Sequence, residues 1–128
     1  MDKIAVVNHF WYLFDRQDWD GLKRLFHPEC KIAWPNTSDD FTPEEYISLN
    51  RKYPGSWKIE VEDVIEAKTK AISVVRIKSK DSCRSLRGIG FFTFEDGLIY
   101  HLLEYFAPDT HKPDWRSKKC KTTGLNHL

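Results

Sequence analysis

One carboxylate, Glu104, stands among apolar and aromatic residues in the run from 98 to 106. A carboxylate in an apolar pocket either pairs with a cation or has a raised pKa. A pKa raised toward neutrality suits a general acid or base. Arg76 and Arg87 lie on neighbouring predicted strands, so a structural ion pair with one of them is the alternative. Glu104 is therefore the catalytic candidate, for proton transfer or hydration, and the ion pair stays open beside it.

Several other side chains could contact a small organic ligand. Tyr46 and Asn50 lie four residues apart on a predicted helix and hence share one face. Arg76 follows two apolar residues on one strand face, so it could clamp an anionic ligand from inside or extend outward over the sheet. A packing role is the alternative for each aromatic or amide side chain. The predicted ligand-binding residues are Trp34, Tyr12, Tyr46, Asn50, Arg76, Tyr100 and Phe106.

Metal and thiol chemistry have little support in the sequence. The five histidines and three cysteines show no ligand spacing typical of a metal site. Arg84 beside Cys83 could lower the pKa of that thiol, but no aligned histidine accompanies it. Neither a glycine-rich phosphate loop nor a serine elbow occurs. We therefore expect no metal and no cofactor.

The first half of the chain must position these residues on helices and one short strand. A helix ends near His27, because Pro28 disfavours helical backbone in the residue before it. Thr42 and Glu45 have the spacing of a capping box at the start of another helix. The predicted elements are helices over 3–15 and 19–27, a strand over 30–34, a polar loop over 36–41 and a helix from 42.

Strands fill the second half. Alternation begins at Trp57 and slips in phase before Val64, which indicates a bulge that bends the sheet. Asp96-Gly97 between two aromatic runs predicts a tight hairpin. Gly88 and Gly90 on one strand face allow strong curvature or close approach of another group. The predicted strands are 57–65, 71–78, 86–94 and 98–106, which form a four-stranded antiparallel meander.

The last strand has two distinct faces, because successive side chains of a strand point to opposite sides. One face should carry Tyr100, Leu102, Glu104 and Phe106, and the other Ile99, His101, Leu103 and Tyr105. Helices followed by an antiparallel meander indicate an α+β domain with the helices on one face of a curved sheet. A chain of 128 residues suits a single domain of this kind.

Short motifs along nearly the whole chain then match one known pattern. They are Asp18-Trp19 with Leu22 and 25–28, Ile32 to Pro35, Asn50 to Gly55, 91–92 with 95–97, Glu104 to Phe106, and Pro113 to Arg116. Their order and spacing resemble the nuclear-transport-factor-2-like superfamily, and within it the SnoaL-like domains. The resemblance implies a cystatin-like fold, in which a cone-shaped, barrel-like antiparallel sheet wraps a long N-terminal helix and leaves a pocket at its open end. It also implies a homodimer through the outer sheet face.

The resemblance also tests one activity. The three catalytic positions of ketosteroid isomerases fall on Phe10, on Trp34 and near Ile89, and all three are apolar here. That chemistry needs a carboxylate base and donors for a developing enolate, so we do not expect it. The same alignment turns Glu104 and Phe106 toward the cavity. Because the superfamily contains isomerases, polyketide cyclases, epoxide hydrolases, dehydratases and binding modules, the fold does not settle the function.

Charge and composition limit the partners. Twenty lysines and arginines balance 19 acidic residues, so no global field attracts nucleic acid or a membrane. The sequence lacks a long apolar run and a signal-peptide layout, so we expect a cytoplasmic protein. We divide it into a SnoaL-like domain over 1–108 and a tail over 109–128. Trp115 of the tail should pack on the domain or on a partner subunit, because an exposed tryptophan is costly.

These inferences give three hypotheses for function. The first is a module that binds a small organic molecule in an aromatic-lined pocket without catalysis. The second is a cofactor-independent enzyme, similar to an isomerase, cyclase or hydratase, that uses Glu104 as its acid or base. The third is a protein-interaction module that acts through its dimer surface.

Overall fold

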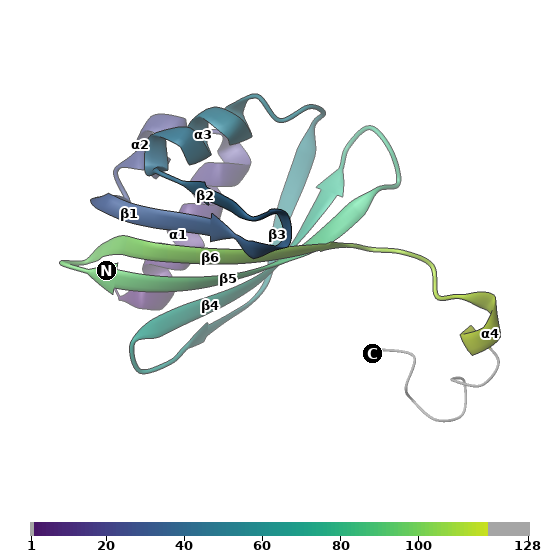
Figure 1. Ribbon diagram of the computed structural model, residues 1–128. Helices are drawn as coiled ribbons and strands as arrows, with labels where there is room; N and C mark the ends of the chain where they lie inside the picture. Colours follow the sequence, from purple (N-terminus) through teal and green to yellow (C-terminus); the bar gives the residue numbers. More distant parts are fainter. Residues whose placement is uncertain (1, 118–128) are drawn as a thin grey trace.

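The computed structural model describes residues 2–117 as a curved six-stranded sheet with helices packed against it (Figure 1). The sheet has the strand order β2-β1-β6-β5-β4-β3. The elements are α1 (Lys3–Arg16), α2 (Trp19–Lys23), β1 (Phe26–Trp34), the 3-10 turn η1 (Pro35–Thr37), β2 (Asp39–Phe41), α3 (Pro43–Arg51), β3 (Trp57–Glu66), β4 (Lys70–Ser79), β5 (Ser85–Glu95), β6 (Leu98–Pro108) and α4 (Asp114–Ser117).

The helix boundaries follow from their caps. The Asp2 side chain accepts a hydrogen bond from the Ala5 amide at 2.7 Å and begins α1. At α3 the predicted capping box is confirmed, because the Glu45 amide donates to Thr42 and the Thr42 amide donates back to Glu45. Both helices therefore begin at a fixed residue, which sets the side chains that they turn toward the sheet.

The region between α2 and α3 differs from its prediction. Strand β1 begins at Phe26 rather than at residue 30, and α2 ends correspondingly early at Lys23. The predicted polar loop over 36–41 is wrong, because its second half forms β2. Ile32 lies opposite Phe41 there, and the pairing satisfies backbone groups on the free side of β1.

The predicted meander of β3 to β6 is confirmed, and its hairpin turn has Asp96 and Gly97 at φ values of 54° and 77°. Strand β1 adds to this meander in parallel with β6. The sheet remains open, with β2 and β3 as its two edges, so the expected barrel-like closure is wrong. The α+β class with a curved sheet over the long helix α1 stands.

Two bulges bend the sheet. The first was predicted and leaves Glu62 unpaired in β3, because Val61 lies opposite Val75 and Asp63 opposite Val74. The second makes Tyr100 the extra residue of β6 and was not predicted. It reverses the alternation before it, so Ile99 is fully buried and the prediction that Ile99 faces outward is wrong.

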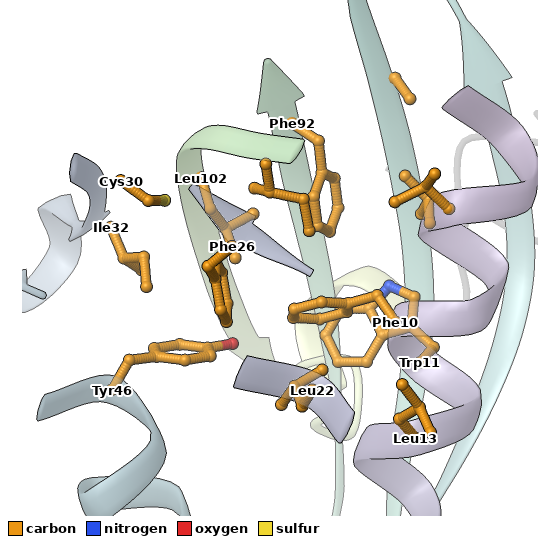
Figure 2. Packing of buried hydrophobic residues seen from close by; sticks show 14 of the residues in the cluster. Phe10, Trp11, Leu13, Leu22, Phe26, Cys30, Ile32, Tyr46, Phe92 and Leu102 are labelled. Carbon is orange, nitrogen blue, oxygen red and sulfur yellow. The ribbon is translucent and has the colours of Figure 1, made fainter. Parts of the chain in front are cut away.

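Aromatic side chains dominate the core between α1 and the sheet. Figure 2 shows Phe10 and Trp11 of α1 facing Phe92 and Leu102 of the sheet. The ring centroid of Phe10 lies 4.8 Å from that of Trp11 and 5.2 Å from that of Phe92, both edge-on. Such edge-on pairs add stability beyond the area they bury. The core therefore holds α1 against the inner face of the sheet.

Helix α4 stands away from the sheet beyond the end of β6 (Figure 1). Its Trp115 is 70% exposed, and the Arg116 guanidinium lies 5.9 Å from the centre of the Trp115 ring. Packing of the tail on the domain or on a partner subunit stays a prediction, and its part over 118–128 lies outside the described residues.

Candidate functional site

A cavity of about 340 Å³ opens between α1, α3 and the inner face of the sheet. Aromatic side chains are the largest group in its wall. The aromatic side chains that line it are Trp11, Phe14, Trp19, Trp34, Tyr46, Tyr53, Trp57 and Phe106. Polar contributions come from Asp15, Gln17, Thr37, Asn50 and Arg51.

Gly88 makes part of this wall possible. A Cβ atom at Gly88 would lie 2.8 Å from the Phe106 ring and 3.3 Å from Val75. Only glycine leaves room for Phe106 at this position, which agrees with the predicted close approach of another group. The glycine of β5 thereby sets the place of an aromatic wall residue on β6.

Glu104 lies directly behind the wall. It is 1% exposed, and one carboxylate oxygen, Oε1, accepts hydrogen bonds from Trp34 Nε1 and the Tyr46 hydroxyl, each at 2.9 Å. The other oxygen, Oε2, has no hydrogen-bond partner among the described residues. Burial raises the pKa of Glu104 to about 7, and the two donated hydrogen bonds offset only part of that rise.

The alternative left open from the sequence, an ion pair of Glu104 with Arg76 or Arg87, is wrong. Arg76 Nε lies 3.6 Å from Asp109, and Arg87 Nε donates to Glu62 at 2.9 Å. Both arginines extend over the outer face of the sheet, opposite to the buried face that holds Glu104. The carboxyl of Glu104 is therefore held by neutral donors alone among residues 2–117.

Tyr46 connects the buried carboxyl to the cavity. Burial and the nearby Glu104 raise the pKa of Tyr46 well above its usual value, so its hydroxyl stays protonated and donates to Glu104. Tyr46 and Trp34 line the cavity, whereas Glu104 does not. A proton exchanged between Glu104 and a ligand would therefore have to pass the Tyr46 hydroxyl or require a small movement of these two side chains.

The indole donors of the wall are turned away from the cavity in the same manner. Trp11 Nε1 donates to Ser73 Oγ at 3.0 Å, and Trp57 Nε1 donates to the Pro54 carbonyl at 2.9 Å. With Trp34 committed to Glu104, three of the four wall tryptophans use their N–H groups inside the protein. The inner wall thus presents ring surfaces to a ligand rather than donors.

Charged groups gather at the mouth. Asp15 Oδ1 accepts from the Ile59 amide and Oδ2 from Lys58 Nζ, both at 2.9 Å. Partial burial raises the pKa of Asp15, but these two hydrogen bonds together with the charges of Lys58 and Lys80 outweigh it and hold that pKa below its usual value. Arg51 is exposed, and no acidic side chain among residues 2–117 pairs with it.

The cavity brings together four of the predicted ligand-binding residues: Trp34, Tyr46, Asn50 and Phe106. Three others lie elsewhere. Tyr12 is 55% exposed on α1, where Arg16 lies 5.2 Å from its ring. Arg76 lies on the outer face, and Tyr100 is the bulged residue, whose ring meets His27 edge-on at 5.0 Å.

Several wall residues were not among the ligand-binding residues predicted from the sequence. Trp11 and Phe14 belong to the apolar stripe of α1, which cannot distinguish a packed neighbour from a cavity wall. Tyr53 and Trp57 flank the turn at Pro54-Gly55. Their rings lie 6.1 Å apart. The sequence feature that could have identified them as wall residues is the presence of two aromatic residues beside a turn that follows a helix.

The structure places no catalytic acid or base at the three positions that correspond to the catalytic residues of ketosteroid isomerases. Phe10 is fully buried in the core, and Ile89 is 40% exposed on the outer face. Trp34 lies in the cavity wall and donates to Glu104 rather than supplying a base. The described residues hold no group of three side chains that could bind a metal ion. No helix in residues 2–117 is long and apolar enough to cross a membrane.

Comparison with known proteins agrees with this fold. A family model described as a SnoaL-like domain matches residues 7–102. A putative ketosteroid isomerase from Kribbella flavida is 21% identical, with a TM-score of 0.79 over 91% of this chain and 85% of its own. An NTF-2 like protein of unknown function from Burkholderia xenovorans is 19% identical, with a TM-score of 0.76 over 89% of each chain.

An LEH-like epoxide hydrolase from M. tuberculosis is 14% identical, with a TM-score of 0.68 over 82% of each chain. At these identities the solved structures share the fold alone. No curated protein matches the chain.

Proposed function

The chain belongs to the SnoaL-like domain family, within the nuclear-transport-factor-2-like superfamily, and we propose that it binds a small organic molecule with a flat, largely apolar body. The observation that carries the proposal is the aromatic cavity, in which three of the four wall tryptophans donate their indole N–H groups within the protein. Its volume of about 340 Å³ falls in the range of small-molecule sites. An apolar ring system can bury its faces against Trp11, Trp34 and Trp57 without leaving their N–H groups unpaired.

The outer face of the sheet supports a homodimer as part of this proposal. Ile89 lies directly opposite Tyr105, and both are about 40% exposed. A second row of directly paired apolar side chains crosses four strands next to them, from Ile65 through Ile72 and Phe91 to Leu103. Contiguous apolar surface of this kind is seldom left uncovered, and a second copy of the chain would cover it.

A cytoplasmic location also stays part of the proposal. Cys30 and Cys83 are free thiols, as a reducing compartment would leave them. Cys30 is buried, and that burial raises the pKa of its thiol to about 12, so it is an unreactive core residue.

Native mass spectrometry of the purified protein with 2-naphthamide tests ligand and oligomer together, and calorimetry gives the affinity. Trp57→Leu removes one aromatic wall and is expected to weaken binding about three- to tenfold. Trp115→Leu is the matched control, because Trp115 lies on α4, outside the cavity. Equal affinity in both variants, or no binding by the unsubstituted protein, would contradict the proposal.

A second candidate is acid–base catalysis that depends on Glu104. It is favoured by a buried carboxyl with a pKa raised to about 7 and one oxygen without a partner, next to two wall residues. A carboxyl with a pKa near neutrality can both take and return a proton.

Proton exchange tests the second candidate. The protein is incubated with 2-tetralone in D₂O, and loss of the signals beside the carbonyl is followed by NMR. Glu104→Gln is expected to slow this exchange by at least about a hundredfold, because general acid–base groups contribute about that much. If the rates of the two proteins agree after correction for the uncatalysed reaction, Glu104 has no such role and the binding function alone remains.

A further inference from the structure

The cavity has an apolar interior and a charged mouth. The inner rings of Trp11 and Trp34 offer faces and edges, since their N–H groups are already used within the protein. At the mouth, Asn50 uses its amide N–H on the Tyr46 carbonyl at 2.8 Å, and Arg51 keeps its donors available. A ligand that satisfies both regions has a ring system inside and a polar group at Arg51.

The charges around the mouth favour one sign for that polar group. The acid that lines the cavity, Asp15, forms an ion pair with Lys58 at 2.9 Å. The positive charge of Lys80 also stabilises the ionised form of Asp15. Arg84 lies 5.8 Å from the centre of the Trp57 ring, which adds another cation beside the wall. Asp15 and Arg51 are the charged residues that line the cavity, and because Asp15 is already paired, the lining itself favours an anion at the opening.

Arg51 is the cation best placed to bind such an anion. It ends α3 one residue after Asn50 and lines the cavity, and no acid in residues 2–117 pairs with it. A guanidinium presents paired donors in a plane that match the two oxygens of a carboxylate. A cationic ligand would meet Arg51, and the only carboxylate among the lining residues, Asp15, is already held by Lys58.

We propose that the ligand is an aromatic acid, with its ring system inside the cavity and its carboxylate on Arg51 at the mouth. The inference rests on the ligand-binding function proposed above and specifies its chemical class. Arg51 then acts as the residue that selects acids over their neutral analogues. The ring surfaces provide most of the affinity, whereas the guanidinium of Arg51 provides the specificity for an acid over a neutral ligand of the same shape.

The test compares 2-naphthoate with 2-naphthamide, which share the ring system and differ in the charge of the substituent. Calorimetry at pH 7.5 and low salt is expected to give about fivefold tighter binding of the acid. Arg51→Gln should bring the two affinities together, and Arg51→Lys should restore part of the difference. Arg24→Gln is the control, because Arg24 is also exposed and carries the same charge but does not line the cavity.

The outcomes separate the two proposals. If both probes bind equally to the unsubstituted protein, the acid preference is overturned while ligand binding stands. If Arg24→Gln lowers the preference as much as Arg51→Gln, the general field and not Arg51 selects the ligand, and the assignment to Arg51 fails. If neither probe binds, the ligand-binding function itself fails with this probe pair. Added salt should reduce the preference and leave the affinity for the amide nearly unchanged.

Discussion

Replacement of Glu104 by glutamine is expected to abolish a fall in stability between about pH 4.5 and pH 7. In the unfolded chain this carboxyl loses its proton near its ordinary pKa of 4.5, whereas burial keeps it protonated in the folded protein until about pH 7. Between those values unfolding releases a proton, so the free energy of unfolding falls as pH rises. Above about pH 7 the loss is complete and amounts to roughly 3 kcal/mol.

Glutamine keeps an oxygen that can accept from Trp34 and Tyr46 but does not titrate. Its amide nitrogen would occupy the place of the unpartnered Oε2, which adds a cost that does not change with pH. The informative quantity is therefore a slope. The free energy of unfolding of the variant minus that of the unsubstituted protein should increase by roughly 3 kcal/mol from pH 4 to pH 8.

Urea denaturation at half-unit pH steps measures this difference. Other carboxyls, including Asp15 with its lowered pKa, contribute equally to both proteins and cancel in the subtraction. Glu29→Gln removes the charge of an exposed glutamate and should give a difference that is flat with pH. A flat difference for Glu104→Gln as well would mean that the carboxyl has the same pKa in the folded as in the unfolded protein, and the case for acid–base chemistry would lose its basis.

Much of the fold could be predicted from local signals. The capping box at Thr42, the hairpin at Asp96-Gly97 and the bulge before Val64 each depend on residues close in sequence, and each is confirmed. The parallel pairing of β1 with β6 joins residues about 70 positions apart, such as Ile32 and Leu102. No local pattern encodes such a partner, which is why the beginning of β1 was misplaced.

The candidate site was less predictable because small register changes decide it. Alternation along β6 correctly put Glu104 and Phe106 on the inner face, but the extra residue Tyr100 reversed Ile99. The sequence also could not show that Arg76 lies on the outer face of the sheet. Its strand has apolar residues on both faces, so the pattern alone gave no direction. The partners of Glu104 were therefore found only in three dimensions.

The residues of the cavity wall were also difficult to predict from the sequence. An aromatic residue in a helical stripe has the same spacing whether its ring meets another side chain or an empty space. Phe10 and Trp11 are neighbours on α1, yet Trp11 lines the cavity and Phe10 does not. The distinction depends on how far α1 stands from the sheet, and that distance depends on the packing of Phe10 itself.

Phe10→Ala is accordingly expected to have the largest effect on stability among single substitutions of α1. The ring is fully buried, and it lies edge-on to Trp11, Phe92 and Phe26 at centroid distances of 4.8, 5.2 and 5.9 Å. Truncation of a buried phenylalanine costs about 3–5 kcal/mol, because the lost contacts add to the cost of the space left behind. Urea denaturation at constant pH measures the loss.

Tyr12→Ala is the matched control on the same helix. Its ring is exposed and contacts Arg16 and His9, so its removal should change stability by no more than about 0.5 kcal/mol. It also tests the sequence prediction that Tyr12 binds the ligand, since a residue outside the cavity should leave the affinity for 2-naphthoate unchanged. Phe10→Ala should weaken that affinity at temperatures where the variant is still folded, because Trp11 and Phe14 of the wall pack against Phe10. A destabilised variant with full affinity would show that the wall is held by the sheet and not by α1.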